Sequence, residues 1–249
     1  MPEYSKPSVL VKESIYCGGC GHGIVQRLIA ECVQELHLEN NTINVVDIAC
    51  CFWSLDALNF DGIAGPHGRC AAVATAIKKV RPEANVFVHA GDGASYGIGL
   101  LETLYAALRD VPITVIVVNN GIFGMTGGQM CPGTTMIGQK TTSSVGGRSK
   151  EAHGMPADFL KIIAAQDIQY AARGALFCAK EIRKTKSFIK KGFMYQSSGS
   201  GFSIIEVLSP CPTNWGVSAL EAEEKIRRDI APVYQPGVYK DRGDEQSWN

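Results

Sequence analysis

The chain has 249 residues, of which 45% are hydrophobic and 19% are charged, and its formal net charge is zero. This composition is ordinary for a globular protein with a full core, and it excludes an acidic disordered chain or a basic nucleic-acid-binding field. Because the sequence shows no apolar leader and no apolar run long enough to span a bilayer, we expect a cytoplasmic protein with no nucleic acid or membrane partner.

Strands and helices alternate in the first third of the chain. Residues 1–16 contain two prolines and predict an extended arm, which leads into a Gly-rich turn that holds Cys17 and Cys20. The apolar pattern then predicts a helix (24–36), a buried strand (43–48), a Gly-rich loop (62–69) and a second helix (70–80).

The next stretch organises the chain. An apolar run, 86–90, ends in Gly91-Asp92-Gly93, and a helix-like segment follows up to residue 108. A second apolar run, 113–118, ends at Asn119-Asn120. Short apolar runs on both sides of a helix indicate two buried, parallel strands, whose carboxyl ends lie at the same edge of a sheet. We therefore expect Asp92 and Asn120 to lie side by side.

These side chains predict a magnesium and phosphate site. A carboxylate, an amide oxygen and a nearby backbone carbonyl suit Mg²⁺, while Gly91 and Gly93 allow close approach of a ligand. The N–H groups and hydroxyl around Gly124, Met125 and Thr126 suit phosphate. A lone Gly-Asp-Gly is more often a simple turn. Followed by 25 residues (94–118) and then Asn-Asn, however, it resembles the diphosphate-binding motif of thiamine diphosphate enzymes.

The second half continues the alternation. Residues 130–155 form a long loop, which we interpret as a lid or a partner-facing surface, with a solvated loop as the alternative. The predicted elements that follow are a helix (158–165), a strand (170–172), a helix (180–190), a strand (202–208) and an amphipathic helix (219–230). The tail, about 232–249, is expected to extend over a neighbouring subunit or to fray. We predict one α/β domain spanning 1–249, with a mostly parallel sheet and helices on both faces.

The nine cysteines indicate metal or redox chemistry rather than disulfides. Cys50 and Cys211 each follow a predicted strand, so both should lie near the edge that holds Asp92, together with the Cys17/Cys20 pair. Four thiolates there fit a [4Fe–4S] cluster or a zinc site, and the cysteines alone do not decide between them. A redox-inert ion is an odd neighbour for a carbanion-forming cofactor, which favours iron–sulfur. Cys51 competes with Cys50 as the third ligand; the other cysteines, Cys32, Cys70, Cys131 and Cys178, are predicted to be small buried side chains.

Both motifs together resemble the β subunit of the 2-oxoacid:ferredoxin oxidoreductases over nearly the whole chain. The resemblance is carried by the segments YCGGCGHGIVQRLIAE, GPHGRCAAVATAIK, AGDGASYGIG, VVNNGIFGMTGGQM, TTMIGQKTT and IIEVLSPCPTNWG, and is greatest to the 2-oxoisovalerate (branched-chain) branch. It implies a thiamine diphosphate-binding fold in which Asp92, the Asn120 side chain and the Ile122 carbonyl hold Mg²⁺ and Thr126 reaches the diphosphate. It also places a [4Fe–4S] cluster on Cys17, Cys20, Cys50 and Cys211.

The resemblance implies oxidative decarboxylation of a 2-oxoacid to acyl-CoA and CO₂, with electrons passed through the cluster to ferredoxin. The carboxylate that activates the cofactor would belong to a partner α subunit, in a complex that also contains γ and ferredoxin-like δ subunits, so this chain alone should be inactive. The departures from the family pattern are Gly18, where Pro is frequent, Ala94, where Asp is frequent, and Cys51, where a small residue is usual.

His22 and Arg69 are further candidates for catalytic roles. His22 could hydrogen-bond the cluster or the cofactor, or only fix its turn, and Arg69 could bind a substrate or CoA anion, or form a structural ion pair. Phe52, Trp53 and Met125 flank the predicted pocket without positive charge, which favours an apolar 2-oxoacid. The alternatives are a non-oxidative thiamine diphosphate decarboxylase or synthase subunit, and a zinc-stabilised subunit without chemistry of its own.

Overall fold

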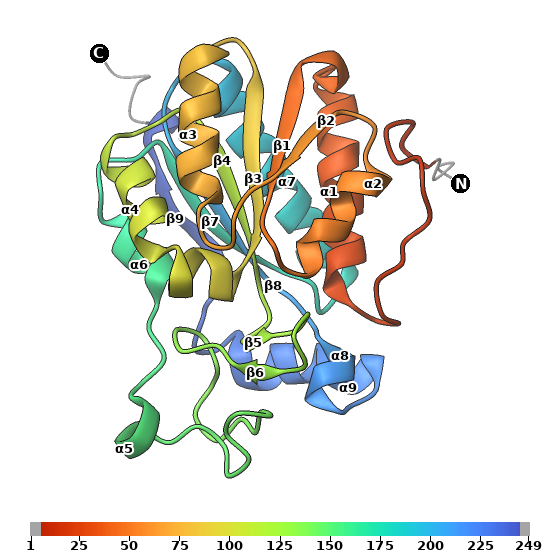
Figure 1. Ribbon diagram of the computed structural model, residues 1–249, viewed down its shortest axis with the longest axis vertical. Helices are drawn as coiled ribbons and strands as arrows, with labels where there is room; N and C mark the ends of the chain where they lie inside the picture. Colours follow the sequence, from red (N-terminus) through yellow and green to blue (C-terminus); the bar gives the residue numbers. More distant parts are fainter. Residues whose placement is uncertain (1–5, 245–249) are drawn as a thin grey trace.

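The computed structural model describes residues 6–244 and is built around a seven-stranded sheet with helices on both faces (Figure 1). The strand order is β2-β1-β3-β4-β8-β7-β9, and every neighbouring pair is parallel except β7–β9. The strands are β1 (Thr42–Val46), β2 (Asp61–Ala64), β3 (Asn85–Gly91), β4 (Thr114–Asn119), β7 (Tyr170–Ala175), β8 (Ser203–Leu208) and β9 (Gly237–Asp241). The predicted α/β fold with a mostly parallel sheet is confirmed.

The helices form two layers. Helices α1 and α7 pack against one another on one face, and α3, α4 and α6 cover the other (Figure 1). Their bounds are α1 (Gly21–Glu35), α3 (Cys70–Val80), α4 (Leu100–Leu108), α6 (Phe159–Ala164) and α7 (Ala179–Ser197); shorter helices are α2 (Ser54–Ala57), α5 (Lys150–His153), α8 (Pro212–Trp215) and α9 (Ala219–Lys225). None of the helices within residues 6–244 has the length and apolar character needed to cross a membrane.

Alternation along the central strands divides the core in two. In β3, Val86 and Val88 face the α3/α4 layer, whereas Phe87 between them faces the α1/α7 layer. Because both faces are covered, β3, β4 and β8 are buried at nearly every position. This is why these strands appear in the sequence as continuous apolar runs rather than as an alternating pattern.

Most predicted elements are present within a few residues of their expected bounds. Helix 70–80 has the predicted bounds, whereas α1 begins three residues earlier, directly after Cys20, and α7 continues to Ser197. The helix before β4 is also present, but most of its apolar stripe does not face the core. Ile98, Leu101, Tyr105 and Leu108 are each more than half exposed, and the core contact is made by small residues together with Leu104.

Two parts of the chain differ from the prediction. The segment assigned to a Gly-rich loop contains β2, an edge strand whose four residues are all exposed, so it has no apolar pattern to reveal it. The tail does not fray or leave the domain over Gly237–Asp241, because these residues add the antiparallel edge strand β9 to β7. Residues 245–249, the end of the predicted tail, and 1–5 of the predicted arm lie outside the described residues.

The long loop after the Asn-Asn motif is ordered around a buried arginine. It begins with a small hairpin, β5 (Ile122–Phe123) and β6 (Gln129–Met130), and contains α5. Arg148 is 2% exposed and donates hydrogen bonds to the carbonyls of Thr135 (2.9 Å) and Gly154 (3.0 Å). The cation therefore holds the two ends of the loop together. A lid or partner-facing role for this loop stays a prediction.

A close backbone crossing at Gly99 gives a first prediction. A methyl group there would collide with the carbonyl oxygens of Gly68 and Ala94. Since backbone atoms cannot move away as a flexible side chain can, Gly99→Ala is expected to destabilise the fold by about 1–3 kcal/mol or more. Thermal unfolding followed by circular dichroism measures this. Gly146→Ala is the control, because its methyl would meet no described atom within 4 Å; equal melting temperatures for the two variants would contradict the prediction.

Candidate active site

Polar and sulfur-containing side chains follow several neighbouring strands of the parallel sheet. Asp92 comes directly after β3, Asn120 directly after β4, Cys50 shortly after β1 and Cys211 shortly after β8. Because the strands are parallel, all four positions lie at the carboxyl edge of the sheet. The β5–β6 hairpin, α8 and α9 gather at the same end (Figure 1).

A cavity of about 180 Å³ lies at this edge, and we call it the Asp92 cavity. It is lined by all the residues predicted to hold Mg²⁺ and the diphosphate, and by His22; the lining includes His22, Cys50, His67, Gly91, Asp92, Gly93, Asn120, Ile122, Phe123, Gly124, Met125 and Thr126. Gly93 lies directly under the ring of Phe123, where a larger side chain would collide. The structure thus brings the two halves of the Gly-Asp-Gly and Asn-Asn motif together.

The Asp92 carboxylate accepts several hydrogen bonds from the protein. Its Oδ2 accepts from the Gly121 amide (3.0 Å) and from the Thr134 hydroxyl, and the Gly93 amide and the Cys131 thiol also donate to the carboxyl. The side chain is 2% exposed, and this burial raises the pKa of the carboxyl to about 6, against the lowering effect of its hydrogen bonds. An ionised Asp92 is therefore short of compensating positive charge, which a bound cation would supply.

The turn after β4 is fixed by its own side chains. Asn120 Oδ1 accepts a hydrogen bond from the Ile122 amide (3.2 Å), and its backbone carbonyl accepts one from the Trp215 ring N–H (3.2 Å). Gly121 between them has a φ of 66°, which glycine adopts without strain. The adjacent loop contains Thr126, which lines the cavity while its hydroxyl donates to Gln129 Oε1 (2.6 Å).

A second cavity, of about 250 Å³, is lined by Cys17, Cys20, Cys50 and Cys211, and we call it the thiol cavity. Gly124 lies between two of the sulfurs, since a methyl group there would be 3.4 Å from Cys50 Sγ and 3.8 Å from Cys211 Sγ. The Asn214 amide donates to Cys211 Sγ (3.4 Å) and to the Gly124 carbonyl (3.1 Å). The four predicted cluster cysteines therefore converge in one hollow.

Two of these thiols, Cys20 and Cys50, are reluctant to ionise. Burial, together with the charges of nearby cysteines, raises the pKa of Cys20 to about 12 and that of Cys50 to about 11. The backbone N–H of His22 opposes the shift at Cys20. Four adjacent thiolates without a metal would repel one another, so a cationic group in the thiol cavity would remove a real electrostatic cost.

The structure distinguishes Cys50 from Cys51. Cys50 lines both cavities, whereas Cys51 is fully buried and directs its thiol to the Asp47 carbonyl (3.5 Å). Cys32, Cys70 and Cys131 are buried as predicted, but Cys178 is exposed, so the prediction that it is a small buried side chain is wrong. It occupies the N-cap position of α7, where the chain runs over the surface.

The two cavities share part of their walls, namely His22, Cys50, Asn120, Gly124 and Met125. His22 is 2% exposed, its ring stacks on Tyr16 with centroids 5.4 Å apart, and burial lowers its pKa to about 4. No residue in 6–244 hydrogen-bonds its buried Nδ1. A neutral imidazole with an unused nitrogen thus lies in the wall between the hollows.

Comparison with known proteins agrees with this geometry. Residues 47–207 match the family described as thiamine pyrophosphate enzyme, C-terminal TPP binding domain. The chain is 36% identical over 231 residues to the ketoisovalerate oxidoreductase subunit VorA of Methanothermobacter marburgensis, covering 92% of this chain and 48% of that protein. It is 30% identical over 230 residues to the 2-oxoacid:ferredoxin oxidoreductase subunit beta of Saccharolobus solfataricus, covering 90% of this chain and 72% of that protein.

The chain belongs to the β-subunit family of the 2-oxoacid:ferredoxin oxidoreductases. The fold agrees: a solved 2-oxoglutarate:ferredoxin oxidoreductase from Magnetococcus marinus, with 2-oxoglutarate, coenzyme A and succinyl-CoA bound, superimposes with a TM-score of 0.72 at 25% identity. That match covers 85% of this chain and 69% of the solved one. The chain spans about half the length of the VorA proteins that it matches.

For this family member, the structure favours the structural alternative at Arg69. Its guanidinium forms an ion pair with Glu102 and is half exposed. Arg69 is not among the residues that line the Asp92 or thiol cavity. The loop that contains Arg69 nevertheless reaches the site through another residue.

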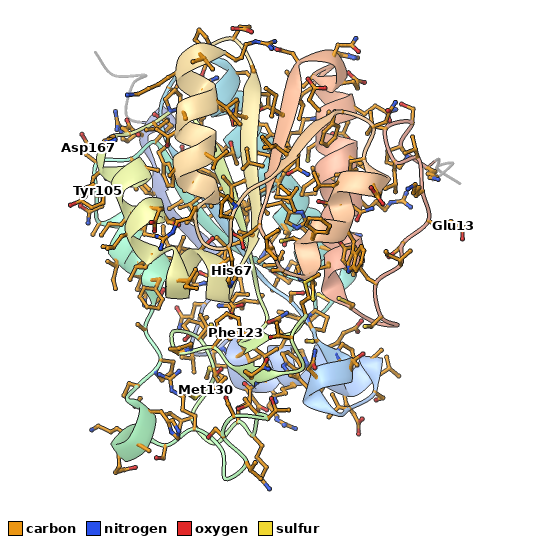
Figure 2. The ribbon with its side chains drawn as sticks, viewed as in Figure 1. Glu13, His67, Tyr105, Phe123, Met130 and Asp167 are labelled. Atoms are coloured by element: carbon orange, nitrogen blue, oxygen red, sulfur yellow. The ribbon has the colours of Figure 1, made fainter. Side chains whose placement is uncertain are left out.

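That residue is His67, which sequence reasoning gave no role. Its Nδ1 lies 2.6 Å from Oδ1 of Asp47, a carboxylate that is 1% exposed and also accepts from the Gly68 amide (2.8 Å). The ring lines the Asp92 cavity and meets Phe123 edge-on, with centroids 6.2 Å apart. Both residues are labelled in Figure 2. Since a carboxylate only accepts, Nδ1 donates to Asp47 and Nε2 is left for the cavity.

Proposed function

We propose that this chain is the thiamine diphosphate- and [4Fe–4S]-binding subunit of a 2-oxoacid:ferredoxin oxidoreductase. The complete enzyme would oxidatively decarboxylate a 2-oxoacid to acyl-CoA and CO₂ and pass the electrons to ferredoxin. The observation that carries the proposal is the common wall of the Asp92 and thiol cavities. A redox centre and a carbanion-forming cofactor would be in contact through it.

The Asp92 cavity fits Mg²⁺ and a diphosphate. The Asp92 carboxylate, the Asn120 side chain and the Ile122 carbonyl form a set of oxygen donors of the kind that Mg²⁺ prefers. Gly91, Gly93 and Gly124 line the cavity, and because they have no side chain, a ligand can approach their backbone closely. Burial disfavours the ionised form of the Asp92 carboxyl, which raises its pKa, and a bound cation would offset that free-energy cost.

The thiol cavity fits a four-iron cluster better than one zinc ion. A single Zn²⁺ needs its ligands within about 2.3 Å of one point. Among residues 6–244, no three His, Cys, Asp or Glu side chains are arranged to hold a single metal ion. A cluster is larger, so it accepts four thiolates spread around a hollow of about 250 Å³.

When bound, the cofactor and cluster supply the carbanion and electron-transfer chemistry, and the chain supplies position and electrostatics. Asp92 and Asn120 would orient the diphosphate. Asn214 donates to Cys211 Sγ, and a hydrogen bond to a cluster sulfur would draw the potential of the cluster upward. His22 and Met125 line both hollows and form part of the wall between them.

An apolar 2-oxoacid, branched-chain or aryl, is the proposed substrate. Among the described residues, no lysine or arginine lines either cavity, while Met125 lines both and Trp53 lines the thiol cavity. A second carboxylate on the substrate would be buried without a lysine or arginine partner, at a cost of several kcal/mol. The ketoisovalerate enzyme among the relatives supports this choice, although the solved relative holds 2-oxoglutarate.

Partner subunits are part of the proposal, an α subunit above all, with γ and ferredoxin-like δ subunits, and ferredoxin as the electron acceptor. Of the described residues that line the Asp92 cavity, Asp92 is the one acid, so the carboxylate that activates the cofactor would come from another chain. The relatives are named as subunits. The exposed apolar stripe of α4, which includes Leu101 and Tyr105, is a surface of the kind that partners cover.

Anaerobic purification of the assembled complex tests this function. We expect about four iron atoms and about four labile sulfides per chain, bound thiamine diphosphate, and CoA-dependent ferredoxin reduction. Zinc without sulfide would indicate a non-catalytic subunit, and Mg²⁺ without iron a non-oxidative decarboxylase or synthase. Reduction should be faster with 2-oxoisovalerate than with 2-oxoglutarate, and the opposite order would contradict the substrate assignment alone.

A further inference from the structure

An arginine and a glutamate are paired inside the sheet, below the active site. Arg173 of β7 and Glu206 of β8 are directly opposite in the strand register, and their side chains are 0% and 1% exposed. Glu206 Oε2 accepts from Arg173 Nε (3.1 Å) and Nη2 (2.9 Å). Two charges have thus been moved from water into the α3/α4 side of the core.

The other side of the guanidinium is also occupied. Nη2 donates to Asp158 Oδ1 at 2.5 Å, and Nη1 donates to the Tyr239 hydroxyl at 2.7 Å. The rings of Tyr234 and Tyr239 lie 5.2 and 5.0 Å from the guanidinium carbon. One buried cation therefore has two carboxylate partners on different elements, of which only Glu206 faces the active site.

Glu206 connects the pair to the Asn-Asn turn. Its Oε1 accepts a hydrogen bond from Asn119 Nδ2 at 2.6 Å. Asn119 Oδ1 in turn accepts from the Gly121 amide at 3.2 Å, and the same amide donates to Asp92 Oδ2 at 3.0 Å. A continuous path of hydrogen bonds runs from the core to the carboxylate that faces the Asp92 cavity.

The direction of this path is determined by chemistry. An ionised carboxylate can only accept, so Glu206 requires the NH₂ of Asn119 to point towards it and the amide oxygen to point towards Gly121. Packed apolar side chains could give similar stability without the desolvation cost of buried charges, so stability alone does not account for the pair. Apolar side chains, however, cannot hydrogen-bond the Asn119 amide and therefore cannot fix its orientation.

We propose that Glu206 is a positioning residue: it fixes the Asn119 amide and, through the Gly121 N–H, the orientation of the Asp92 carboxylate. The inference rests on the proposed function, since it is the Mg²⁺–diphosphate that would bind there. Arg173 holds the Glu206 carboxylate in place through two hydrogen bonds. Outer-shell partners of metal ligands commonly contribute about 10- to 100-fold to metal affinity.

Two isosteric variants separate positioning from packing. Glu206→Gln cannot accept from both Asn119 Nδ2 and Arg173, because one end of its amide is a donor. Asp158→Asn removes one negative charge from the same guanidinium but leaves the Asn119 acceptor intact. In the assembled complex freed of thiamine diphosphate, we expect Glu206→Gln to weaken Mg²⁺–thiamine diphosphate binding about 10- to 100-fold, measured by calorimetry. Asp158→Asn should bind as the wild type does, although both variants melt at lower temperatures.

The spectrum of Mn²⁺ in place of Mg²⁺ gives a second readout, since ligand geometry rather than stability determines its line shape. It should change in Glu206→Gln and not in Asp158→Asn. If Glu206→Gln does not fold, Asn119→Leu breaks the same path with the ion pair intact and should show the same loss. Equal affinities for wild type and Asn119→Leu, or equal losses for the two isosteric variants, would overturn the inference. A wild-type complex that binds no thiamine diphosphate would instead overturn the proposed function.

Discussion

Replacing Cys50 by alanine is expected to abolish the iron–sulfur cluster, whereas the same change at the adjacent Cys51 is expected to leave it intact. The reason is the direction of the two thiols: Cys50 lines both cavities, and Cys51 directs its sulfur to the Asp47 carbonyl in the core. Iron should fall from about four atoms per chain to less than about one in Cys50→Ala and should remain near four in Cys51→Ala. Iron and sulfide assays with electron paramagnetic resonance of the reduced protein measure this.

Cys51→Ala is a demanding control, because it removes the same atoms one residue away and from a fully buried site. It should lose some stability from the vacated volume and none of the spectroscopic signal. Iron retained in Cys50→Ala and lost in Cys51→Ala would show that the register of the third ligand is shifted by one residue.

Replacing Asp92 by asparagine is expected to separate cofactor binding from stability. Loss of the one carboxylate among the proposed Mg²⁺ ligands should cost about 3 kcal/mol, or about 100-fold or more in affinity for Mg²⁺–thiamine diphosphate. The apo protein, however, should melt no lower than wild type at pH 8. Calorimetric titration measures the affinity, and thermal unfolding in the absence of Mg²⁺ measures the stability.

The sign of the stability effect follows from the pKa of Asp92. Burial raises it to about 6 in the folded protein, above the value of about 4 expected for an unfolded chain. The free energy of unfolding that this group contributes therefore falls as the pH rises from about 4 to about 6 and is lowest above 6. Asparagine removes the ionisation at pH 8. A marked drop in apo melting temperature would show that the Gly121 and Thr134 hydrogen bonds outweigh the buried charge.

The site residues that follow long buried strands were predictable from sequence. Asp92, Asn120 and Cys211 each come just after a continuous apolar run, and parallel pairing requires the ends of such runs to meet at one edge. Their convergence needs no knowledge of the loops. The same reasoning gave the general position of Cys50, and helical apolar spacing predicted the first helix, although three residues late.

The remainder depends on tertiary structure that leaves no local pattern. The Asp47–His67 contact requires β2, whose four exposed residues carry no periodicity. Whether Cys50 or Cys51 faces the cavities depends on how the short 3₁₀ turn Cys50–Trp53, which follows β1, is rotated about its axis. Arg173 lies beyond the end of the strand predicted at 170–172, and its partner Glu206 interrupts an apolar run. That these two charges form an ion pair becomes apparent only once β7 is known to lie beside β8.

Because all of this chemistry lies where the strands end, the opposite end of the sheet is free of it. The turn before β3 is exposed at Arg81, Pro82 and Glu83, and the ion pair between Arg81 and Glu83 is on the surface. A reporter or an immobilising tether inserted there would be separated from the active site by the full length of the sheet. Because the central strands are parallel and the binding residues lie at their carboxyl ends, we expect attachments at the amino ends of these strands to leave binding unchanged.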